Sequence, residues 1–188
     1  MQRIQTISSY LIWVFTFLLI ALPLWALFQW VFIEWQPIQN LMLQGFISKS
    51  IETPEGLVNL AQLKFTPLSW SIGLCGIIIG SAPVFLGLLI IRKLFQNYHR
   101  SHIFSLENAQ KYKYLTWLFF LDALFIKPIS NMLMILSATL SNPPGHRYIS
   151  LSFGTPNLEV LFYGMLAIII SWIMVEGYKL QEEKNLTI

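Results

Sequence analysis

Four long apolar runs, separated by more polar segments, dominate the pattern of the chain. They cover residues 10–33, 68–91, 115–138 and 158–180. Each run exceeds the roughly 20 residues that an α-helix needs to cross about 30 Å of hydrocarbon. The pattern therefore predicts an all-α membrane protein with four transmembrane helices, forming a single four-helix membrane domain over residues 1–188.

The segments between the runs predict a small cap outside the membrane. Residues 141–145 read SNPPG, a turn sequence, and residues 146–153 then alternate between polar and apolar side chains. A period of two is typical of a β-strand, so we expect a small, partly β extracytoplasmic cap. In the loop after the first run, Thr53, Pro54 and Glu55 match a helix start. That helix would lie on the membrane surface or, as we favour, cover the mouth of the bundle.

The first run has a second interpretation, a signal peptide, because Arg3 precedes it. The run is long and aromatic for a signal peptide, and no small-residue cleavage motif follows it. We therefore expect a retained membrane anchor, with Trp30 and Trp35 in the aromatic belt at the membrane surface.

Composition supports the membrane class. Hydrophobic residues make up 55% of the chain and charged residues 11%, and the mean hydropathy is +0.61. A soluble domain usually carries about 25% charged residues. Cys75 is the single cysteine, so no intrachain disulfide can form.

The distribution of basic residues predicts the topology. Eight Lys and Arg residues occur in the N-terminus, the second loop and the C-terminus, against three in the other two loops. Basic loops favour the cytoplasmic side, so both termini are expected in the cytoplasm. The same distribution explains the net charge of +3 through membrane topology and anionic lipid headgroups. No direct nucleic acid binding is expected.

Small residues mark one face of the second run. Gly73, Gly76, Gly80 and Gly87 follow one another at intervals of three, four and seven residues. Such spacing lets a second helix approach closely. The alternative, a phosphate-binding loop, would require a Lys-Ser/Thr ending that the segment lacks. We therefore predict a helix-packing role for the four glycines.

The third run contains Asp122, Lys127 and Asn131 at membrane depth. A charge there costs about 2.5–3.5 kcal/mol on insertion scales, so such residues usually face inward and are often functional. Asp122 and Lys127 lie about 140° apart on an ideal helix. Pro128 removes the hydrogen bond to the Leu124 carbonyl, and local unwinding would bring the two charges together. The three residues form a candidate intramembrane polar site, which is either a structural ion pair or a gate, proton relay or ligand site.

Recognisable catalytic and metal-binding motifs are missing from the sequence. His99 and His102 are three residues apart, but no third metal ligand accompanies them. We expect no enzymatic activity, no metal and no cofactor.

Two short motifs resemble a known family. The segment FSLEN at residues 104–108 precedes the third run, and the chain ends in EEKNLTI. The length, the layout of the runs and these motifs resemble small bacterial four-helix integral membrane proteins of unknown function. The resemblance implies the bacterial inner (cytoplasmic) membrane. Members are often encoded beside a Cro/CI-like helix-turn-helix regulator, which implies a cytoplasmic partner of that kind.

The motif positions are therefore candidate partner-docking residues: Phe104, Ser105, Glu107, Asn108, Glu182 and Glu183. The leading hypothesis is a non-enzymatic inner-membrane protein, a membrane tether or sensor that acts through a small DNA-binding regulator. The alternative is an oligomeric small transporter or channel component that uses Asp122 and Lys127. Four spans are few for a transporter, so this alternative requires a homo-oligomer.

Overall fold

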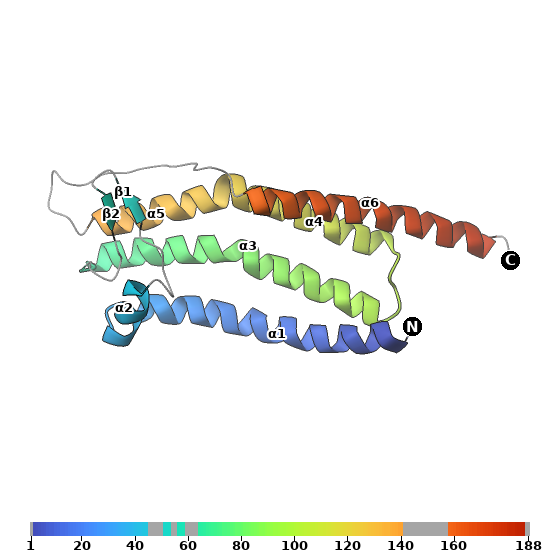
Figure 1. The fold of residues 1–188 in the computed structure, drawn as a ribbon, viewed down its shortest axis with the longest axis horizontal. Coiled ribbons are helices and arrows are strands. Elements are labelled where there is room, and N and C mark those ends of the chain that lie inside the picture. The colour runs from blue at the N-terminus through green and yellow to red at the C-terminus, as the bar shows by residue number, and fades with distance from the viewer. Residues whose placement is uncertain (1, 45–50, 54–55, 59–63, 141–157, 187–188) are drawn as a thin grey trace. The chain divides into compact units, whose positions relative to one another are not determined.

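The computed structural model describes residues 2–44, 51–53, 56–58, 64–140 and 158–186. Four helices in these segments are long and apolar enough to cross a membrane. Three are α1 (Gln2–Val31), α3 (Pro67–His99) and α6 (Leu158–Leu186). The remaining span is continuous but composite (Figure 1): α4 (Leu106–Leu121), the π-helix η2 (Asp122–Ile126) and α5 (Lys127–Thr139). The prediction of four helices long and apolar enough to span a membrane is confirmed, and such helices indicate a multi-pass membrane protein.

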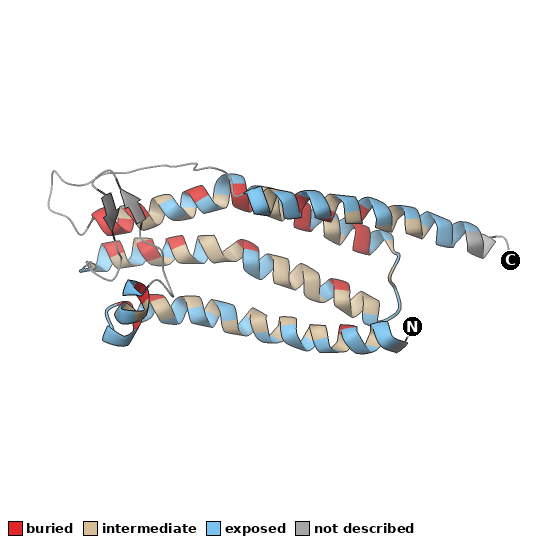
Figure 2. Cartoon of the chain, viewed as in Figure 1, coloured by how far each residue is buried: buried red, intermediate tan, exposed pale blue. Residues whose placement is uncertain are grey.

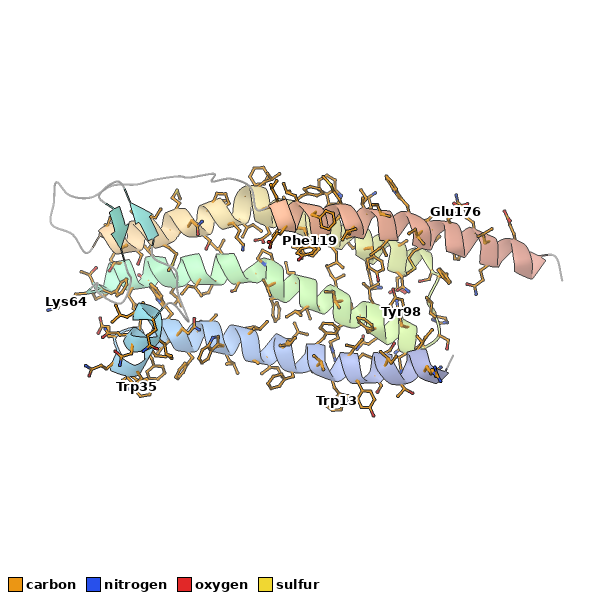
Figure 3. The ribbon with its side chains drawn as sticks, in the orientation of Figure 1. Trp13, Trp35, Lys64, Tyr98, Phe119 and Glu176 are labelled. Atoms are coloured by element: carbon orange, nitrogen blue, oxygen red, sulfur yellow. The ribbon has the colours of Figure 1, made fainter. Side chains whose placement is uncertain are left out.

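Large apolar side chains cover the outer faces of these helices. Trp13 on α1 is 75% exposed and points away from the neighbouring helices (Figure 3), and Trp172 on α6 is exposed as well. Figure 2 shows exposed residues along most of α1 and α6. So much exposed apolar surface is unfavourable in water and is suited to lipid.

The chain divides into two compact units, and prolines lie at the division. Unit 1 contains the described residues of Met1–Leu22, Pro83–Leu124 and Thr155–Ile188, and unit 2 those of Pro23–Ala82 and Phe125–Gly154. The division follows Leu22 in α1 and Ala82 in α3, directly before a proline in each case, and it falls inside η2 in the third span. Proline removes a backbone hydrogen bond from a helix interior, so α1 and α3 each lose one such bond at the division.

In unit 1, α4 packs along α6. A Cβ atom at Gly164 would lie 3.4 Å from the Phe120 ring, so the glycine allows a close approach. Deeper along the interface, the Ser171 hydroxyl donates a hydrogen bond of 2.8 Å to the Ala109 carbonyl. The glycine allows tight packing between the two helices, and the hydrogen bond satisfies a polar group inside their interface.

In unit 2, the core forms around Trp30, which is 1% exposed. Its indole N–H donates a hydrogen bond of 3.0 Å to the Trp70 carbonyl. The short helix α2 (Gln36–Leu43) buries Ile38 and Met42 in the same core. The prediction of Trp30 in a surface belt is wrong, because the core supplies both an apolar contact and a hydrogen-bond acceptor. Trp35 is exposed, as a belt residue would be.

The first loop contains a hairpin where a helix was predicted. Strand β1 (Ile51–Thr53) pairs antiparallel with β2 (Gly56–Val58), so that Thr53 lies opposite Gly56. The predicted helix start at Thr53 is therefore wrong: proline and glycine at this spacing also favour a tight turn. The strand predicted at residues 146–153 lies outside the described residues, so the described part of the chain does not support the predicted β structure there.

Candidate functional site

Three of the four predicted glycines face α5 within unit 2. A Cβ atom at Gly73 would meet Trp30 and the Ser137 hydroxyl, and one at Gly76 would lie 3.2 Å from the Leu133 Cβ. A Cβ atom at Gly80 would meet Ser130. The helices therefore approach so closely that there is no room for a side chain at these positions.

Serines on α5 use this close approach. The Ser130 hydroxyl donates to the Gly76 carbonyl at 2.9 Å, and the Ser137 hydroxyl donates to the Ser69 carbonyl at 2.6 Å. The two serines are seven residues apart and so lie on one face of α5. Sequence reasoning missed Ser137 and Ser69. The sequence signal that could have indicated this contact is the seven-residue spacing of Ser130 and Ser137, which matches the spacing of the glycines on α3.

The distortion expected near Pro128 takes the form of a π-helix. Residues Asp122–Ile126 form η2, and Pro128 follows as the second residue of α5. A π-turn accommodates the missing amide hydrogen by bonding from i to i+5, and such turns occur frequently at functional sites. The break in the third span therefore lies at the most polar part of its membrane segment.

The intramembrane polar residues have different surroundings. Asp122 is 8% exposed, whereas Lys127 and Asn131 are exposed. The expectation of an inward-facing charge therefore fits Asp122 and does not fit Lys127. The long apolar stem of lysine can lie along the helix surface and carry its ammonium toward water. Asp122 and Lys127 belong to different units, and their pairing stays a prediction.

Asp122 lines an apolar cavity of about 200 Å³ in unit 1. The cavity lies between α3, which contributes Pro83 and Gly87, and α4, which contributes Leu118 and Phe119. Gly87 differs here from the other three glycines, because a Cβ atom on it would lie 3.5 Å from the Leu118 side chain, an ordinary contact. The loose packing around Gly87 leaves the space that the carboxylate borders.

At the other end of unit 1, the predicted docking motif begins a helix. Ser105 is the N-cap of α4, and its hydroxyl accepts a hydrogen bond of 3.2 Å from the Asn108 backbone amide. Glu107 stands in the first turn, is exposed, and pairs with Lys111. The cap and the acid both stabilise the positive end of the helix.

Asn108 has a structural position inside this motif, because its exposed fraction is 0%. Its side-chain amide donates to the carbonyls of His102 at 2.7 Å and Ile103 at 2.9 Å. Its side-chain oxygen accepts a hydrogen bond of 2.7 Å from Asn97 on α3. Asn108 therefore fixes the loop between α3 and α4, a role that the local sequence did not indicate.

The two predicted docking segments meet in one cleft. Phe104 and Glu182 line a cleft of about 290 Å³ together with Tyr178 and Gln181 of α6. A Cβ atom at Gly177 would lie 2.5 Å from the nearest atom of the Phe104 ring, so the absence of a side chain here lets the ring pack against α6. Glu183 is exposed beside the cleft-lining residues of α6.

Further polar contacts lie at the same end of unit 1. His99 is hydrogen-bonded through its Nδ1 atom to the Gln5 carbonyl at 3.1 Å, and the Tyr98 hydroxyl of α3 lies 2.9 Å from the Tyr112 hydroxyl of α4. Figure 3 shows Tyr98 near the end of α3. Within the residues that the structure describes, no group of three His, Cys, Asp or Glu side chains could hold a metal ion.

Comparison with protein families gives one informative result. The model of the family described as "Protein of unknown function (DUF2975)" matches residues 1–188. Searches of curated proteins and of solved structures give no significant match. Because the match covers the whole sequence, the chain belongs to this family of uncharacterised proteins.

Proposed function

We propose that the protein is a non-catalytic tether or sensor that binds a small, basic helix-turn-helix regulator at the cytoplasmic face of a bacterial inner membrane. The observation that carries the proposal is the cleft in which Phe104 and Glu182 meet. These residues come from two segments about 75 positions apart in the sequence, and each segment belongs to a motif shared with the resembling family.

The cleft offers suitable chemistry for such a partner. Phe104 is 43% exposed although Gly177 seats its ring, so one side of the ring is available for an apolar side chain. Glu182 and Gln181 are exposed and supply a carboxylate and an amide at the rim. Aromatic centres with polar rims are common in protein interfaces, and DNA-binding domains are rich in basic residues.

The layout of unit 1 is consistent with a cytoplasmic location. The beginning of α1, the loop between α3 and α4 and the end of α6 lie at one end of the unit (Figure 1). The Gln5 side chain donates a hydrogen bond of 2.9 Å to the Ser101 hydroxyl, which ties α1 to that loop. This end also carries most of the basic residues, which favours the cytoplasmic side.

Binding to a purified helix-turn-helix regulator, encoded beside the gene as the resemblance implies, tests the proposal. The intact protein, in a neutral detergent, should bind it, and Phe104→Ala and Glu182→Gln should each weaken binding about tenfold. Glu176→Gln is the matched control, because Glu176 is an exposed acid of α6 that does not line the cleft. Absence of binding by the wild-type protein, or equal losses for Glu182→Gln and Glu176→Gln, would overturn the proposal.

A further inference from the structure

The cavity beside Asp122 is separate from the docking cleft and has no role in the proposed function. Its volume of about 200 Å³ exceeds that of an engineered apolar cavity of about 150 Å³ that holds benzene. It is bordered by the middle of α3 and by the end of α4, well inside the apolar part of both spans. A ligand would therefore have to reach this cavity through the lipid bilayer.

One ionisable group borders an otherwise apolar wall. Among the residues that line the cavity, Asp122 is the only ionisable one, and Leu115, Leu118 and Phe119 supply much of the rest. A carboxylate in such surroundings is stabilised by a nearby cation, because attraction between charges is stronger where water is scarce. An anion would be repelled, and a bare metal ion would find too few oxygen ligands on this wall.

Local backbone features create the site. Gly87 leaves open the space that a larger side chain would fill toward Leu118, and Pro83 occupies the adjacent turn of α3. Asp122 is the first residue of η2, the π-turn in the third span. The space and the carboxylate thus come from two irregular positions on facing helices, and π-turns of this kind are frequent at functional sites.

We propose that this cavity binds a small lipophilic organic cation, with its charged nitrogen beside the Asp122 carboxylate and its apolar body against Leu118 and Phe119. Charge complementarity and the size of the cavity favour this occupant. An aromatic ring on the ligand would also contact the Phe119 ring, which is half-buried at the cavity wall.

Two probes of the same shape separate charge from apolar filling. Benzyltrimethylammonium carries a quaternary nitrogen where neopentylbenzene carries a neutral carbon. Titration of each into the intact protein in a neutral detergent, followed by calorimetry, should show saturable binding of the cation at least about tenfold tighter than that of the neutral probe. This comparison requires only the wild-type protein, so it does not depend on the folding of a variant.

Variants then locate the site. Asp122→Asn should weaken binding of the cation about tenfold, and Gly87→Leu should abolish it by filling the cavity. Glu176→Gln, which removes an exposed acid outside the cavity, should leave the affinity unchanged. The proposal is overturned if the wild-type protein shows no saturable binding of the cation or binds both probes equally well. Unchanged affinity in both Asp122→Asn and Gly87→Leu would also overturn it.

Discussion

At the scale of single residues, buried hydrogen bonds hold the loop that presents Phe104. Asn108 makes three side-chain hydrogen bonds, and replacement by alanine would leave the carbonyls of His102 and Ile103 and the Asn97 amide without this partner. We expect Asn108→Ala to lower the free energy of unfolding by about 2–3 kcal/mol. Denaturant titration in detergent measures it, with exposed Gln110→Ala as the control. A loss no larger than that of the control would contradict this role.

The glycine face of α3 gives a second prediction at this scale. At Gly76, a Cβ atom would lie 3.3 Å from the Ser130 backbone oxygen, so a large side chain would force α3 and α5 apart. Gly76→Leu should cost about 1–3 kcal/mol of stability, which thermal unfolding can detect. Cys75→Leu is the neighbouring control, because Cys75 is exposed. Equal stability of the two variants would show that α3 and α5 do not pack as described.

At the scale of the element, η2 begins at Asp122 and ends directly before Lys127, the two intramembrane charged residues. If a single partner of a charge pair is removed, the other is left in an apolar medium, whereas removal of both is often nearly neutral. The sequence predicts such a pair, but Lys127 is exposed whereas Asp122 is buried, so we expect the changes in thermal stability of Asp122→Leu and Lys127→Leu to add in the double variant. Recovery of most of the loss in the double variant would instead show that the two charges pair across the π-turn.

How far the sequence predicts the elements depends on whether the cause is local. The four spans follow from apolar runs that are long enough by themselves, and the disturbance near Pro128 follows from its missing amide hydrogen. Strand β1 ends at Thr53, where the sequence predicts a helix start, because Thr53 followed by proline fits either structure. Similarly, Trp30 near the end of a span fits a membrane belt as well as a core.

The candidate sites depend more on tertiary contacts, which a single sequence does not reveal. The motif around Phe104 and the acid Glu182 could be recognised separately, but their shared cleft depends on the seat that Gly177 provides. The hydrogen bond between the side chains of Asn97 and Asn108 joins α3 directly to α4. The cavity beside Asp122 depends on how the side chains of facing helices pack, so no pattern of residues in the sequence predicts it.

At the scale of the whole molecule, the proposed topology is testable in cells. In a Cys75→Ser background, single cysteines in place of exposed Ser101 and exposed Lys64 can be probed with a maleimide that does not cross membranes. The distribution of basic residues predicts labelling of intact cells at position 64 and protection at position 101. Labelling at position 101 with protection at position 64 would invert the topology.

Photocrosslinking in living cells shows whether the cleft of Phe104 and Glu182 binds a soluble regulator. The photoreactive amino acid p-benzoylphenylalanine is placed at Gln181, which lines the cleft, or at Trp172, an exposed residue elsewhere on α6. Irradiation is expected to join the regulator to the protein from position 181 and not from position 172. Cross-linking of the regulator from neither position, or equally from both, would contradict it.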